Sequence, residues 1–156
     1  MFQGALHVKI VHQDEKQIKG FSIRTANAKE MNPATSKIGA LHQLFGDKVA
    51  VNYKIGGSVY GVYYNYESDY SGEYSVLAGA DQIESTLVEN LETVTIPAGT
   101  YMVFEAKGSV PQIVIETWSK IWEYFSTGNA QYQRSYKTDF ELYKSQNEIE
   151  IYIAVE

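Results

Sequence analysis

One short segment near the C-terminal end constrains the fold most, because it alternates apolar residues with a carboxylate in its middle. In Thr138–Tyr143, Phe140 and Leu142 occupy alternate positions, and a strand places alternate residues on opposite faces. These two residues would face a core, and Glu141 and Tyr143 would lie together on the other face. If that face lines a cavity, a poorly solvated carboxylate beside an aromatic ring suits a ligand that is both cationic and apolar. The alternative is a face in water, where a glutamate is ordinary.

The pattern of apolar residues elsewhere predicts strands interrupted by helices. One helix is expected with Asn32 as its N-cap and Pro33 at its first helical position, and Gly46 can end it. A second helix follows from the helical spacing of apolar residues between Val114 and Phe125. Strands are expected at 18–24, 59–66, 74–79, 93–96, 100–107, 139–144 and 148–155, the last two joined by a hairpin connection at 145–147.

The order of these elements repeats, since each half of the chain reads strand, helix, strand, strand. A local match supports the repeat, because Tyr60–Tyr63 aligns with Phe140–Tyr143 and places Gly61 opposite Glu141. One half would then supply the charge and the other the space around it. We therefore expect a single α+β domain over residues 1–156, with modules at about 1–90 and 91–156 and a groove at their seam.

Charge and aromatic content narrow the choice of partner. The net charge is −6 and the pI is near 5.1, without a dense cluster of Lys and Arg, so direct binding to nucleic acid is not expected. Thirteen tyrosines outnumber six phenylalanines and two tryptophans, and tyrosine suits half-wet pockets because its apolar ring carries a polar tip. No apolar run approaches the ~20 residues of a membrane span, and Met1–His7 does not resemble a secretory signal. We expect a cytoplasmic protein without a membrane partner.

Metal and nucleophile chemistry find little support in the sequence. There is no cysteine, and His7, His12 and His42 are not spaced as metal ligands. No nucleophile-elbow motif is present. We therefore expect neither a metal nor a cofactor.

Three segments of the chain carry a family resemblance. They are 60–66 with 73–79, 96–108 with the later Ile121-Trp122, and 139–143 with 150–153. In their order and spacing they resemble the effector-binding domains of bacterial transcription regulators, the GyrI-like or AraC-type superfamily. The likeness is strongest to its standalone members, the integron-cassette-encoded effector-binding proteins.

This resemblance implies two tandem β-α-β-β modules related by a pseudo-twofold, with a ligand pocket between them. It also implies that a glutamate of the penultimate strand meets cationic aromatic molecules, and Glu141 holds that place. Aromatic residues of neighbouring strands would form the walls, with Trp118 as an alternative to Trp122, and Glu150 matches a second acidic position. The ligand-binding candidates are Glu141, Tyr60, Tyr63, Tyr74, Tyr101, Trp122, Tyr143, Glu150 and Tyr152.

The function implied is an effector sensor or ligand-binding module for small amphipathic, cationic aromatic molecules, linked to transcription regulation and without enzyme activity. No helix-turn-helix precedes the first expected strand, so a role at DNA would require a separate DNA-binding protein. One alternative is a small hydrolase in which Glu141 acts as a base that activates water on an electrophilic ligand. Another is a structural protein that presents a sheet edge or a tyrosine-rich face to a partner.

Overall fold

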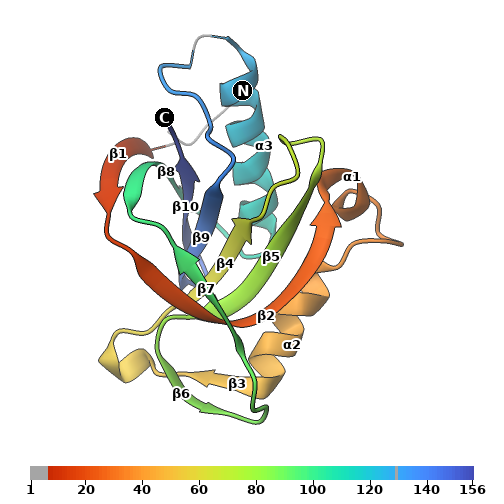
Figure 1. Ribbon diagram of the computed structural model, residues 1–156, viewed down its shortest axis with the longest axis vertical. Coiled ribbons are helices and arrows are strands. Elements are labelled where there is room, and N and C mark those ends of the chain that lie inside the picture. The colour runs from red at the N-terminus through yellow and green to blue at the C-terminus, as the bar shows by residue number, and fades with distance from the viewer. Residues whose placement is uncertain (1–6, 129) are drawn as a thin grey trace.

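The computed structural model describes residues 7–128 and 130–156, so most of the N-terminal segment considered above lies outside it. A large antiparallel sheet and a few helices make up the described part, which is the α+β class predicted from the sequence (Figure 1). The strands are β1 (His7–Gln13), β2 (Lys16–Ala26), β3 (Val49–Val51), β4 (Val59–Tyr64), β5 (Glu73–Ala80), β6 (Ile83–Thr86), β7 (Glu92–Ile96), β8 (Gly99–Lys107), β9 (Thr138–Ser145) and β10 (Glu148–Ala154). The helices are α1 (Asn27–Glu30), α2 (Ile38–Lys48), the 3₁₀ helix η1 (Tyr53–Ile55) and α3 (Gln112–Ser126).

The strand order of the main sheet is symmetric about its middle. In the described residues the order is β1-β8-β10-β9-β4-β5-β2-β7, and each pairing is antiparallel. From the central β4–β9 pair outward, each half of the chain contributes the second, third and first strand of its strand–helix–strand–strand unit. Two tandem modules would produce this order, with β1 and β7 added at the edges.

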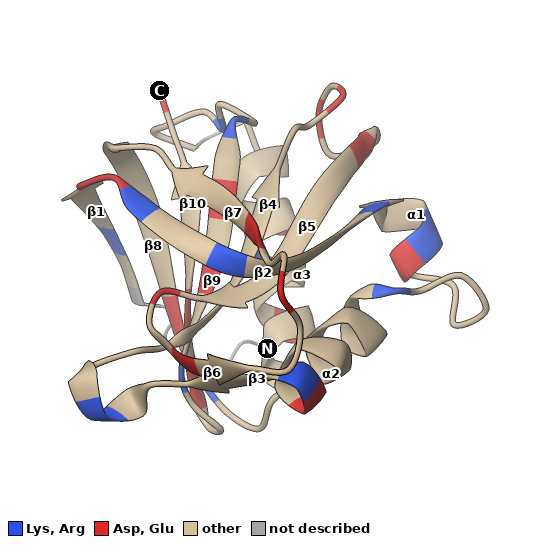
Figure 2. Cartoon of the chain, turned by 60° about the horizontal axis from the view of Figure 1, so that its bottom comes forward, with Lys and Arg blue, Asp and Glu red and all other residues tan. Residues whose placement is uncertain are grey.

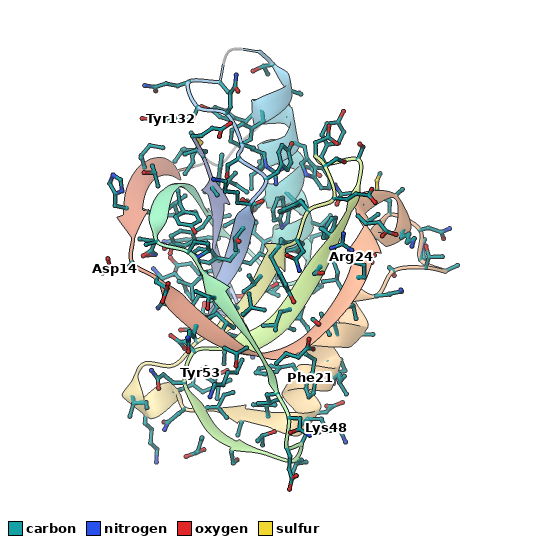
Figure 3. All side chains as sticks on the ribbon, viewed as in Figure 1. Asp14, Phe21, Arg24, Lys48, Tyr53 and Tyr132 are labelled. Carbon is teal, nitrogen blue, oxygen red and sulfur yellow. The ribbon has the colours of Figure 1, made fainter. Side chains whose placement is uncertain are left out.

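One bent ribbon joins the two edges of the sheet. Two-residue links join β1 to β2 and β7 to β8, yet β1 pairs with β8 at one edge and β2 with β7 at the other. The register continues through the bend, since Gln13 pairs with Gly99 and Lys16 with Ile96. Figure 3 shows the bend at Asp14. The ribbon therefore curves back over the central strands instead of leaving them as a flat sheet (Figure 1).

This curvature encloses a core on one face of the sheet, which we call the inner core. Its buried members come from all the central strands and from the ribbon, as expected where alternate residues of each strand point the same way. They are Ile18, Tyr60, Val62, Leu77, Ile96, Tyr101, Val103, Phe140, Tyr152 and Ala154. One face of β9 is thereby occupied by packed side chains.

Helices α2 and α3 pack on the other face of the sheet. Helix α2 contacts β2 and β5, while α3 contacts β8 and β10, so each helix covers the flank contributed by its own half of the chain. The buried residues of α2 are Leu41 and Phe45, and those of α3 include Trp118 and Ile121. The central strands β4 and β9 lie between the two helices, and this position defines the site described below.

The structure corrects the prediction for the first helix. Helix α2 begins at Ile38, because Asn32 instead forms a turn in which its Oδ1 accepts the N–H of Ala34 at 2.9 Å. The carboxylate of Glu30 accepts the N–H groups of Lys37 and Ile38 at 3.0–3.1 Å and so caps the helix from outside. The helix also passes through Gly46 and ends at Lys48. The short or exposed strands β1, β3 and β6 were not predicted.

Candidate functional site

Glu141 lies at the middle of the sheet, on the face between the two helices. On β9 it is directly paired with Gly61 of β4, the two residues that the internal match had placed opposite each other. The Glu141 side chain is 0% exposed. A Cβ added to Gly61 would lie 2.5 Å from Glu141 Oε1, which is closer than atoms approach without something moving. Glycine at 61 therefore provides the space that the carboxylate occupies.

Three neutral groups donate hydrogen bonds to this carboxylate. Oε2 accepts from the Tyr63 hydroxyl at 2.8 Å and from Trp118 Nε1 at 2.7 Å, and Oε1 accepts from the Tyr143 hydroxyl at 2.7 Å. Burial, followed by the charge of Glu141, raises the pKa of both tyrosines well above the ordinary value, so both stay protonated donors. Indole N–H can only donate. The three donors stabilise a negative charge without neutralising it.

A cavity of about 1600 Å³ opens above Glu141, between α2 and α3. Its wall is a continuous set of aromatic rings, in which Tyr63 lies 5.1 Å from Trp118 and 5.6 Å from Tyr74 between ring centroids, and Trp118 lies 6.3 Å from Trp122. Large apolar residues on its lining are also exposed to solvent: Met31, Tyr53, Tyr70 and Ile115. The rim of the cavity is therefore apolar and exposed to solvent, whereas its floor holds the buried charge of Glu141.

Glu141 is the buried charge in the lining that has no cationic partner among the described residues. The lining also includes Glu30, Arg134 and Lys144. Glu30 caps α2, Arg134 pairs with Asp139 at 2.7 Å, and Lys144 lies 3.5 Å from Glu150. No Lys, Arg or His of residues 7–128 and 130–156 forms an ion pair with Glu141. A buried carboxylate in this state is costly for the free protein and favours a positive partner.

Asp139 is a second buried carboxylate on the same face of β9, two residues before Glu141, and it is fully compensated. Its Oδ2 accepts from Arg134 Nη2 at 2.7 Å and from the Tyr66 hydroxyl at 2.6 Å, while Oδ1 accepts the N–H of Ala154 at 2.8 Å. The guanidinium also lies over the Tyr136 ring at 4.3 Å. This ion pair fixes the loop after α3 against the ends of β9 and β10.

His42 on α2 completes the cavity floor. Its ring packs edge-on against Tyr143 with 5.3 Å between centroids, and its buried Nε2 has no hydrogen-bond partner among the described residues. Burial lowers the pKa of His42, and the nearby charge of Glu141 opposes that shift. The Nε2 atom lies 3.4 Å from the point where a Gly61 Cβ would stand.

The structure brings five of the nine predicted ligand-binding residues to this cavity and places four on the opposite face. Glu141, Tyr63, Tyr74, Trp122 and Tyr143 line the cavity. Tyr60, Tyr101 and Tyr152 belong to the inner core, and Glu150 accepts the Tyr152 hydroxyl there at 2.8 Å.

The reason for this division is register. Tyr60 pairs with Leu142 and Tyr152 with Phe140, and paired residues of neighbouring strands project to the same face. We therefore do not propose Tyr60, Tyr101, Glu150 or Tyr152 as ligand contacts.

Three residues of the site were not singled out from the sequence. His42 follows Ile38 by one helical turn and so could have been placed on the cavity side of α2. Asp139 shares the face of Glu141 by strand alternation. Arg134 lies in the loop between α3 and β9, where no periodicity points to its role.

Comparison with known proteins places the chain in a defined family. Residues 9–155 match the family model described as the integron-associated effector binding protein, Cass2. The crystal structure of the integron cassette protein VCH_CASS2, from the mobile metagenome of Vibrio cholerae, is 40% identical with a TM-score of 0.85, covering 96% of this chain and 95% of that one.

Two further relatives are similar over almost the whole chain. A protein of Bacillus subtilis (strain 168) named as a candidate transcriptional regulator, YobU, is 31% identical over 94% of this chain and 96% of its own length. The structure of SAV2435 bound to tetraphenylphosphonium is 18% identical with a TM-score of 0.64, covering 97% of this chain and 94% of that one, and shows the same fold. Within the described residues, no helix has the length and apolar character that crossing a bilayer requires.

Proposed function

The chain belongs to the family of integron-associated effector-binding proteins, and from the geometry of its cavity we propose that it binds lipophilic aromatic cations. The observation that carries the proposal is the buried carboxylate of Glu141, held by Tyr63, Trp118 and Tyr143 but by no cation of the described chain. A bound cation supplies the missing charge, and the aromatic wall supplies cation–π contact and apolar burial.

The volume and aromatic lining of the cavity support a large aromatic ligand. Its volume of about 1600 Å³ exceeds the range of about 300–1,000 Å³ that is usual for drug-sized ligands. SAV2435, which shares the fold, was solved with the bulky cation tetraphenylphosphonium. That ligand belongs to SAV2435, and its extension to this chain is part of our proposal.

The proposed role is sensing, with a separate protein making any contact with DNA. YobU is named as a candidate transcriptional regulator, which supports a place in regulation. A phosphate-binding role is not supported, since Figure 2 shows an acidic link between the basic residues of β1 and those of β2, and the net charge is −6. In this role the ligand would be released unchanged.

The test is a comparison of ions of the same shape and opposite charge. Isothermal titration calorimetry would use tetraphenylphosphonium, its anionic counterpart tetraphenylborate, and neutral triphenylphosphine oxide. We expect the cation to bind at least about tenfold more tightly than the neutral compound, because only the cation compensates Glu141. The cation should also raise the melting temperature, since it binds the folded state alone. Equal affinity for the three compounds, or none for the cation, would refute the proposal.

A second assay tests the claim that no chemistry follows binding. Incubation with activated esters and strained-ring electrophiles, followed by mass spectrometry, should give no more than one product molecule per protein. Repeated turnover that is lost in Glu141→Gln would instead support a hydrolase in which this glutamate activates water.

A further inference from the structure

The floor of the cavity holds two acceptor atoms that lie close to Gly61. Glu141 Oε1 lies 2.5 Å and His42 Nε2 lies 3.4 Å from the position of a Cβ on Gly61. These atoms come from β9 and α2, and both lie beside Gly61 of β4, which has no side chain to separate them. The arrangement is specific to this corner, since it depends on three separate elements.

One of the two oxygens of Glu141 retains acceptor capacity. A carboxylate offers about four lone-pair sites, two on each oxygen. Tyr63 and Trp118 occupy those of Oε2, whereas Oε1 accepts only from Tyr143 among the described residues. Oε1 therefore retains one lone-pair site that no described residue occupies.

His42 Nε2 is buried and without a hydrogen-bond partner in the described residues. Such atoms are uncommon because a buried polar group without a partner is costly. Beside a bound cation, the neutral ring with its lone pair on Nε2 is the favoured tautomer, because a protonated Nε2 would present a positive hydrogen to a positive ligand. The burial that lowers the pKa of His42 acts in the same direction.

We propose that this corner recognises the N–H groups of a protonated amine, with one N–H donating to Glu141 Oε1 and a second donating to His42 Nε2. The inference rests on the proposed cation-binding function and narrows its ligand class to lipophilic primary or secondary ammonium ions. A quaternary ammonium or phosphonium ion has no N–H, so it would compensate the charge of Glu141 and leave His42 Nε2 without a partner. A site built to receive hydrogen bonds discriminates against an analogue that lacks the donors.

The experiment uses three compounds that share one apolar group, 3,3-diphenylpropyl, and differ in the group at its end. They are 3,3-diphenylpropylammonium, its N,N,N-trimethyl derivative, and the neutral 3,3-diphenylpropan-1-ol. In calorimetry on the wild type we expect the primary ammonium to bind about tenfold or more tightly than the trimethyl ion, a difference typical of an unmatched buried polar group. Equal affinities of the two ions, both above that of the alcohol, would overturn this inference and leave the proposed function standing. Equal affinities of all three compounds would overturn the proposed function itself.

Two variants of His42 add a second readout. His42→Phe keeps a flat ring but removes the acceptor, so it should lower the affinity for the primary ammonium to that for the trimethyl ion and leave the latter unchanged. His42→Gln can place an oxygen near the Nε2 position and should retain part of the preference. A preference that survives intact in a folded His42→Phe protein would contradict the role of His42. The wild-type comparison decides the matter if that variant does not fold.

Discussion

Asp139 and Glu141 lie two residues apart on the same face of one strand, and both are 0% exposed. Their partners differ, because only Asp139 has a cationic side chain beside it among the described residues. Asp139 has Arg134 at 2.7 Å, a tyrosine hydroxyl and a backbone N–H. Glu141 has only neutral donors and faces a cavity. The first carboxylate completes a structural ion pair, whereas the second has no cationic partner among the described residues, which is the basis of the proposed ligand role.

The difference separates a charge that is paired within the fold from one that the proposed ligand would pair. Burial alone does not distinguish them, and neither does the number of hydrogen bonds. The distinction is whether the countercharge belongs to the fold, because a buried charge without its partner is strongly destabilising. Substitutions that change the countercharge should therefore separate the two carboxylates.

The largest effect on the free energy of unfolding is expected when Asp139 loses its cationic partner, which leaves it without a countercharge like Glu141. Arg134→Met removes the cation and leaves a buried, uncompensated carboxylate, which costs about 3–5 kcal/mol in comparable cases. Urea unfolding followed by circular dichroism should show this loss in the free energy of unfolding. Adding Asp139→Asn to Arg134→Met should recover part of it, because the unpaired charge is then gone.

An exposed ion pair is the control for that substitution. Lys29 and Glu73 are 3.5 Å apart, with side chains 48% and 44% exposed, so Lys29→Met should change the free energy of unfolding by less than about 1 kcal/mol. Similar losses for Arg134→Met and Lys29→Met would show that the buried pair does not hold the structure as described.

The next effect concerns the space beside Glu141. In Gly61→Ala the new methyl group would lie 2.5 Å from Oε1, so the carboxylate or the strands must shift, at a cost of about 1–3 kcal/mol. Tetraphenylphosphonium affinity should fall at the same time. Gly99→Ala is the matched strand control, since a Cβ there meets nothing within 4 Å. Equal unfolding curves for the two alanine variants would contradict the close packing of Gly61 and Glu141.

At Glu141 itself we expect an effect on stability as small as that of the exposed-pair control. In Glu141→Gln the amide oxygen can take the Oε2 position and accept from Tyr63 and Trp118, while its NH₂ group can donate to the Tyr143 hydroxyl. The lost charge-assisted hydrogen bonds are offset by removal of a buried charge, so the free energy of unfolding should change by at most about 1 kcal/mol. A loss as large as that of Arg134→Met would mean that Glu141 is a structural charge after all.

The sequence singled out Glu141 as a binding candidate but did not single out Asp139. Strand alternation in Thr138–Tyr143 located Glu141 and Tyr143 on the face opposite Phe140, and the same alternation also applies to Asp139. Pairing between strands was less predictable, because it depends on register across segments far apart in the chain. The candidates Tyr60, Tyr101 and Tyr152 were therefore assigned to one wall although they face the inner core.

Features that depend on contacts from irregular segments could not be read from the pattern. Helix α2 begins at Ile38 because the Glu30 carboxylate at the end of α1 caps it, and no local capping signal near Ile38 shows this. Arg134 reaches Asp139 from a loop without periodicity. The bent ribbon also escapes prediction, since two-residue links normally suggest hairpins and not strands at opposite edges of a sheet.

The most direct test of the account is the affinity of tetraphenylphosphonium for Glu141→Gln, measured by calorimetry beside the wild type and Glu30→Gln. Glu30 is a second carboxylate in the cavity lining, but it caps α2 and should matter little for the ligand. We expect Glu141→Gln to weaken binding of the cation about tenfold or more, with binding of neutral triphenylphosphine oxide unchanged and Glu30→Gln close to the wild type. The same cation affinity in Glu141→Gln and the wild type would contradict the claim that this buried, uncompensated charge is what the ligand meets.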